Sequence, residues 1–177
     1  KKDIKVAQIL LSHDDLVNRR RYLNAKHTIE ALLERNVIPI INENDSVTVE
    51  EIKIGDNDTL SATVACLVDA QLLIILSDVE GLFNRDPSIK IKGEKAELLS
   101  HVARVNDEIE RTAGKSNNKL TVGGMYTKVI AAKKTMSFGI PTLVVNGLDE
   151  KVLENIFSGK DVGTLFWSGK GKIRDRK

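Results

Sequence analysis

The 177-residue sequence contains a single cysteine, Cys66, so an internal disulfide is impossible. A lone cysteine with no histidine near it in sequence fits a reducing compartment and is typical of a packing residue. We expect Cys66 to be buried in a helix rather than to act as a nucleophile. No secretory signal precedes the first predicted strand, so we expect a cytoplasmic protein.

An excess of charge is also missing, since 27 basic and 25 acidic residues give a net charge of only +2. That balance gives no reason to expect nucleic acid as a partner. The apolar runs are short, as in residues 71–76 (QLLIIL), and none approaches the roughly 20 residues of a membrane span. A hydrophobic content of 41% instead predicts a globular protein with a substantial core.

Two common kinds of catalytic pattern are absent as well. The three histidines, His13, His27 and His101, are scattered without the spacing of metal ligands, so we expect no protein-built metal site. The phosphate-binding motif G-x-x-x-x-G-K-[ST] does not occur either. Any phosphate chemistry must therefore depend on another pattern.

Apolar runs of strand length alternate with helical patterns along the chain. Near-continuous apolar strands that alternate with helices predict an α/β fold, a three-layer αβα sandwich with a mainly parallel sheet. Asp58 is a plausible N-cap of the helix over residues 58–70, and Gly139 is a plausible C-cap of the helix over residues 125–139. Predicted strands cover residues 5–11, 37–42, 72–78, 98–102, 141–147 and 162–168, and predicted helices cover 18–35, 58–70, 106–114, 125–139 and 149–159.

Polar clusters collect next to these strands, where a parallel sheet binds its ligands. Residues 42–45 (NEND) end the second strand, residues 56–58 (DND) begin the next helix, and Ser77 and Asp78 end the third strand. Each cluster also has a purely structural interpretation, since Asn and Asp favour turns and helix caps. Four such residues in a row are more than a turn needs, so the first cluster favours a ligand site.

A glycine pair precedes the helix predicted over residues 125–139. Paired glycines allow backbone amides to face an anion at a helix N-terminus. Lys128 follows Met125 by three positions, so it lies at the edge of the apolar stripe and can reach a phosphate from there. The structural alternative is a simple hinge before an amphipathic helix.

Taken together and in this order, the motifs resemble the amino acid kinase family from about Val6 to Phe166. The specific feature is the pairing of residues 41–45 (INEND) with residues 55–62 (GDNDTLSA). That pairing resembles the branch of the family that phosphorylates the side-chain carboxylate of glutamate in proline biosynthesis. The resemblance implies L-glutamate and ATP as ligands, Mg²⁺ as a cofactor, a homo-oligomer, and feedback inhibition by proline.

The resemblance also implies roles for individual residues. Asp58 and Lys128 would be catalytic, with Asp58 organising the lysines that contact phosphate. Asp45, Asn57 and Asn44 would bind glutamate, and Ser77 and Asp78 would lie at the nucleotide. The loop that closes on the phosphates of the nucleotide would comprise Val122, Gly123, Gly124, Met125, Tyr126, Thr127 and Lys128.

Members of this family open with a strand and a lysine–glycine–serine phosphate loop, which these residues do not contain. We therefore expect residues 1–167 to form the C-terminal portion of an amino acid kinase domain that is incomplete at its N-terminus. Residues 168–177 are expected to be a basic linker or tail. By themselves these residues are expected to lack kinase activity.

Two alternatives remain at this point. A uridylate or isopentenyl phosphate kinase of the same family would act on an anionic substrate, which favours basic residues where residues 41–45 stand. A non-catalytic association fragment would bind neither glutamate nor ATP well. Glutamate phosphorylation itself needs no general base, because the carboxylate is already a nucleophile at neutral pH, and this agrees with the lack of a histidine–serine constellation.

Overall fold

A computed structural model describes residues 3–44, 56–87, 95–114 and 124–169. Every predicted strand and helix is present, and one short helix, α1, was not predicted. The strands are β1 (Val6–Leu11), β2 (Ile38–Glu43), β3 (Leu73–Ser77), β4 (His101–Val102), β5 (Thr142–Asn146) and β6 (Thr164–Phe166). The helices are α1 (His13–Val17), α2 (Arg19–Glu34), α3 (Asn57–Leu67), α4 (Asp107–Thr112), α5 (Met125–Ser137) and α6 (Val152–Phe157).

The strands of the described part form two sheets rather than the single sheet that the alternation suggests. β1 and β2 pair in parallel, while the other four strands follow the order β3-β5-β6-β4. β3 pairs with β5 and β4 with β6 in parallel, whereas β5 and β6 are antiparallel. The prediction of an α/β fold with mainly parallel strands is confirmed.

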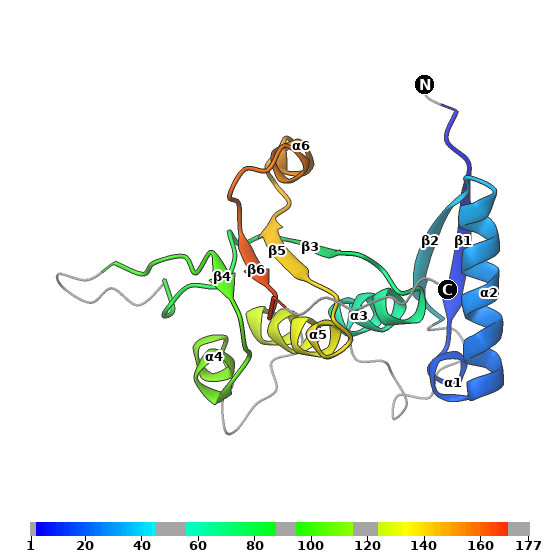
Figure 1. The fold of residues 1–177 in the computed structure, drawn as a ribbon, viewed down its shortest axis with the longest axis horizontal. Helices are drawn as coiled ribbons and strands as arrows, with labels where there is room; N and C mark the ends of the chain where they lie inside the picture. Colours follow the sequence, from blue (N-terminus) through cyan, green and yellow to red (C-terminus); the bar gives the residue numbers. More distant parts are fainter. Residues whose placement is uncertain (1–2, 45–55, 88–94, 115–123, 170–177) are drawn as a thin grey trace.

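Helices cover both faces of the four-stranded sheet (Figure 1), as the three-layer prediction requires. Toward α3, α4 and α5, the strands present Ile75, Val144 and Phe166, which are buried against Ala62 and Val129. On the opposite face, the strand residues Leu143 and Val145 meet Val152 of α6. Successive residues of β5 therefore supply two different cores, as expected for a strand that is buried on both faces.

Helices α3 and α5 lie side by side beneath the sheet (Figure 1). Small buried residues make the close packing possible, with Ala62 and Cys66 on α3 and Ala131 and Ala132 on α5. Cys66 is 7% exposed, which confirms its predicted packing role. The helices are also joined by polar contacts, one of which runs from the Lys134 ammonium to the hydroxyl of Thr63 at 2.6 Å.

The N-cap predicted for α3 is wrong by two residues. The cap is Asp56, whose carboxylate accepts a hydrogen bond from the backbone N–H of Thr59 at 2.7 Å. Asp56 has the extended backbone that a capping residue needs, while Asp58 lies inside the first helical turn. Because Asp56 satisfies the helix end, the carboxylate of Asp58 is available for contacts outside its own helix.

Gly163, which precedes β6, has a left-handed φ of +70°, and a Cβ there would lie 2.2 Å from the carbonyl oxygen of Val144. Gly159 has a similar φ of +79°, but nothing lies within 4 Å of its missing Cβ. Gly159→Ala should therefore lower the free energy of unfolding by only about 1–2 kcal/mol, the usual cost of a left-handed alanine. Gly163→Ala should cost about 3–5 kcal/mol, because the backbone of β5 must also move.

Urea unfolding of the two variants, followed by far-UV circular dichroism, measures this difference. Gly159→Ala is the matched control, since it introduces the same side chain at nearly the same φ. Equal losses of stability in the two variants would show that the contact between Gly163 and β5 is not tight.

Candidate functional site

An ion pair joins the first turns of α3 and α5. The Lys128 Nζ lies 3.1 Å from the Oδ2 of Asp58, and the two side chains are only 13% and 16% exposed. A pair this far removed from solvent is screened less by water and salt than an exposed one. The two residues predicted to be catalytic, 70 positions apart in the sequence, are thus brought into direct contact.

Thr127 contacts the same carboxylate oxygen. Its Oγ1 lies 2.7 Å from Oδ2 of Asp58 and 2.8 Å from the carbonyl oxygen of Gly124. In the described part of the chain, no hydrogen bond reaches the other oxygen of Asp58, Oδ1. The carboxylate is therefore held through Oδ2 by two consecutive residues of α5.

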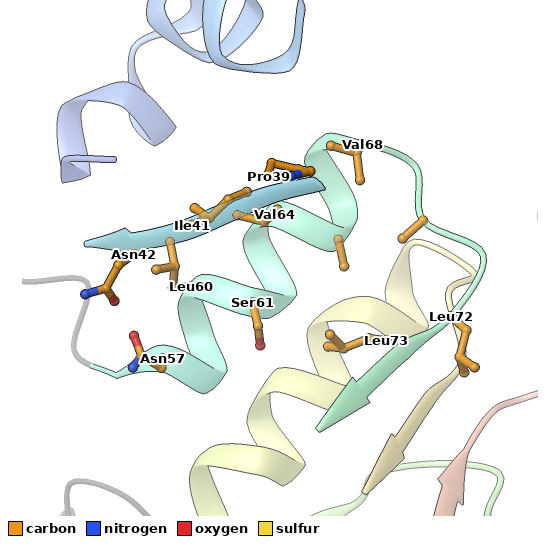
Figure 2. Close-up of a pocket in the computed structure, with 12 residues that line it drawn as sticks. Pro39, Ile41, Asn42, Asn57, Leu60, Ser61, Val64, Val68, Leu72 and Leu73 are labelled. Atoms are coloured by element: carbon orange, nitrogen blue, oxygen red, sulfur yellow. The ribbon is translucent and has the colours of Figure 1, made fainter. Parts of the chain in front are cut away.

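A groove of about 530 Å³ runs between β2, α3 and the start of β3 (Figure 2). Asn42 of β2 and Asn57 of α3 lie together at one end, where their amides offer both hydrogen-bond donors and acceptors. The rest of the groove is mainly apolar, with Ile41, Leu60 and Val64 along its middle (Figure 2). The polar end is the part of the groove suited to a small polar substrate.

The other residues predicted to bind substrate are less informative. Asn44 continues from β2, and its backbone N–H bonds the carbonyl oxygen of Leu11 at 2.9 Å. Asp45 lies outside the described residues. Asn42 belongs to the polar cluster at residues 42–45 and offers an amide donor, and it faces Asn57 at the polar end of the groove (Figure 2).

A second cavity, of about 780 Å³, opens at the carboxyl end of β3. Four of the predicted nucleotide residues line it: Ser77, Asp78, Gly124 and Met125. Tyr126 packs instead against the core that α5 forms with the sheet, and Val122 and Gly123 lie outside the described residues. The position of this cavity agrees with the rule that ligands bind beyond the carboxyl ends of parallel strands.

Sequence reasoning missed several residues of this cavity. Leu82 and Phe83 supply apolar surface, while Arg85 and Arg111 supply positive charge. Arg85 lies in the loop that follows β3, so its position after a strand was a usable signal. Arg111 comes from α4, and no pattern in the sequence connects that helix to this cavity.

The ion pair connects the residues that line the two spaces. Asn57, at the polar end of the groove, directly precedes Asp58, while Gly124 and Met125, at the second cavity, precede Lys128 by one helical turn. The two helix turns that the pair joins therefore each contribute residues to one of the two spaces. This arrangement suits the transfer of a group from a ligand in one space to a ligand in the other.

This chain resembles a family profile and curated relatives. A family profile described as "Amino acid kinase family" matches residues 1–146. A curated protein of Geobacter metallireducens named "Glutamate 5-kinase" is 50% identical over 173 residues, which is 98% of this chain and 46% of that protein. A protein of the same name from Meiothermus ruber is 48% identical over 175 residues, 99% of this chain and 46% of its own length. The chain therefore spans about half the length of the curated relatives it matches.

Solved structures show the same fold at low sequence identity. A UMP kinase from Bacillus anthracis has a TM-score of 0.59 at 17% identity, with 96% of this chain and 61% of that chain covered. An isopentenyl phosphate kinase of T. acidophilum has a TM-score of 0.57 at 15% identity, with 92% and 60% covered. Among the described residues, no helix combines the length and apolar character that crossing a membrane requires. Because the family profile matches residues 1–146 of the 177, this chain belongs to the amino acid kinase family.

Proposed function

We propose that the complete protein containing these residues transfers the γ-phosphoryl group of ATP to the γ-carboxylate of L-glutamate. The product would be L-glutamyl 5-phosphate, formed in the first step of proline biosynthesis. The observation that carries the proposal is the Asp58–Lys128 pair, which joins the first turn of α3, where Asn57 lines the amide end of the groove, to the first turn of α5, where Met125 lines the cavity at the carboxyl end of β3. About 50% identity to proteins named glutamate 5-kinase supports the choice of substrate.

The second cavity fits a nucleotide. Leu82 and Phe83 offer apolar surface to a base, and Arg85 and Arg111 offer positive charge to phosphate groups. Gly124, at the N-cap of α5, allows phosphate to approach the N-terminus of that helix closely. We propose Ser77, Asp78 and the segment 122–128 as nucleotide contacts, and the Lys128 ammonium as the group that reaches the transferred phosphoryl.

Glutamate would occupy the polar end of the groove. Its carboxylates can accept hydrogen bonds from the amide of Asn57 and from Asn42 beside it. Its ammonium needs an anionic partner, and we propose Asp45 for that role, with Asn44 as a further contact. None of the described residues that line the groove is a lysine or an arginine, so an anionic phosphate substrate is less well matched.

Catalysis would depend on position and charge rather than on proton transfer. The substrate carboxylate attacks the γ-phosphorus in line while the bond to the ADP oxygen breaks, and no general base is required. Lys128 would neutralise the negative charge on the phosphoryl oxygens, and Asp58 would hold that lysine in place beforehand. A contact that is ready before the substrates arrive avoids the cost of reorganisation during the reaction.

ATP is proposed to bind with Mg²⁺, which would neutralise part of the phosphate charge when bound. Mg²⁺ in kinases usually takes one or two carboxylates, with phosphate oxygens and water as its other ligands. Among the described residues, Asp78 is an acidic residue of the cavity that could supply such an oxygen. From the resemblance alone, we further propose a cytoplasmic homo-oligomer that proline inhibits.

Product trapping tests the proposed reaction directly. The complete protein is incubated with ATP, Mg²⁺ and either glutamate, aspartate, UMP or isopentenyl phosphate, and acyl phosphate is trapped as the hydroxamate. Release of ADP is followed in parallel for the substrates that form no acyl phosphate. We expect hydroxamate with glutamate and little ADP release with the other three. Turnover of UMP or isopentenyl phosphate in preference to glutamate would contradict the proposal.

Asn57→Ala tests the substrate end of the groove. The loss of a hydrogen bond to a charged carboxylate is worth about 1.5–3 kcal/mol, so the KM for glutamate should rise about tenfold or more. The KM for ATP should change much less, because Asn57 does not line the second cavity. Steady-state kinetics with each substrate varied in turn measures both constants.

Asn24→Ala is the control for this substitution, since Asn24 is exposed on α2 and lies in neither space. Its constants should equal those of the parent enzyme. If Asn57→Ala raised both KM values equally, Asn57 would not be a selective glutamate contact.

A further inference from the structure

Two consecutive residues of α5 converge on one oxygen atom. The Thr127 hydroxyl and the Lys128 ammonium lie 2.7 Å and 3.1 Å from Oδ2 of Asp58. Consecutive side chains of a helix point about 100° apart, so they meet at one atom only when that atom lies between them. The carboxylate of Asp58 occupies such a position opposite the first turn of α5.

The Thr127 hydroxyl has one proton and two acceptors within reach, Oδ2 of Asp58 and the carbonyl oxygen of Gly124 at 2.8 Å. A carboxylate forms the stronger hydrogen bond because it is charged. Gly124 is the N-cap of α5, and an N-cap carbonyl already accepts the first hydrogen bond of its helix. The Thr127 hydroxyl therefore donates its hydrogen bond to the carboxylate of Asp58.

The two contacts to Asp58 differ in rigidity. Lysine has a long flexible side chain and a mobile ammonium, whereas threonine is short and has a restricted χ1 angle. If Lys128 moves to the transferring phosphoryl group, Asp58 loses its ion-pair partner but keeps the hydrogen bond from Thr127. Without that bond, a carboxylate that is only 16% exposed would be left with no described partner, and it could reorient.

We infer that Thr127 is a positioning residue, which fixes the Asp58 carboxylate while Lys128 exchanges between Asp58 and the transferring phosphoryl group. The inference rests on the proposed function. Within the segment 122–128, it assigns Thr127 a role through Asp58 and Lys128, in place of the contact with the nucleotide that was proposed for the segment as a whole. The two roles have different kinetic consequences, because a nucleotide contact affects ATP binding, whereas a positioning residue affects the transfer step.

The test compares Thr127→Val with Thr127→Ser in the complete protein. Valine keeps the shape and branching of threonine but lacks the hydroxyl, whereas serine keeps the hydroxyl. We expect Thr127→Val to lower kcat about 10- to 100-fold and to change the KM for ATP less than threefold. Thr127→Ser should recover most of the lost kcat.

Thr28→Val is the matched control. The hydroxyl of Thr28 donates to the carbonyl oxygen of Asn24 on the exposed face of α2, at 2.8 Å, and Thr28 lines neither space. Its kcat should stay within about twofold of the parent value. An increase in the KM for ATP with kcat unchanged in Thr127→Val, or a serine variant as impaired as the valine variant, would overturn the inference.

A second measurement separates this inference from the proposed function. Urea unfolding of the complete protein is compared for Thr127→Val, Asp58→Ala and the double variant. We expect the effects on the unfolding equilibrium constant to be non-additive by about threefold or more, because both substitutions remove the same bond. Additive effects would overturn the inference even if glutamate is the substrate. Coupling in a protein that does not phosphorylate glutamate would contradict the proposed function alone.

Discussion

The contact between Asp58 and Lys128 is the interaction on which the arrangement of the site depends. Each group lies in a place that water reaches poorly, so each would be costly without the other. The pair forms only because α3 and α5 begin at the same end of the domain and pack closely through small side chains. The core of the domain thus determines the position of the lysine that the proposed chemistry needs.

The proposed chemistry needs little of the usual catalytic apparatus. A carboxylate substrate needs no base, and phosphoryl transfer is promoted mainly by position and by neutralisation of charge. The fold is shared with kinases that, by their names, act on UMP and isopentenyl phosphate, at sequence identities of 15–17%. We expect such proteins to select different substrates through the residues that line the groove, such as Asn42 and Asn57, rather than through the sheet.

Much of the fold follows from the sequence because its signals are local. Alternating apolar strands and periodic helices predicted every long element, and the stripe of Val129 and Ala132 on α5 is buried as its spacing indicates. The antiparallel pairing of β5 with β6 was not predictable, since it depends on how the chain turns after α6. The division into two sheets was likewise invisible in the strand patterns.

The site was predicted less completely, for physical reasons. Two aspartates compete for the cap of α3, and only the backbone conformation shows that Asp56 fills it and leaves Asp58 to Lys128. The contacts of Thr127 and Arg111 depend on tertiary packing, which no local pattern encodes. The types of residue near the strand ends therefore predicted where the site lies. Which side chains contact one another within the site could be seen only in the structure.

The most direct test of this account is the kcat of Lys128→Met in the complete protein. It is measured with saturating ATP and glutamate, at a temperature well below the midpoint of thermal unfolding. Loss of a group that stabilises charge in the transition state typically costs about 10²–10³ in rate, and we predict a fall in that range. Lys95→Met, at an exposed position outside both spaces, should leave kcat unchanged. A kcat for Lys128→Met within a few-fold of the parent value would show that the pair is structural only.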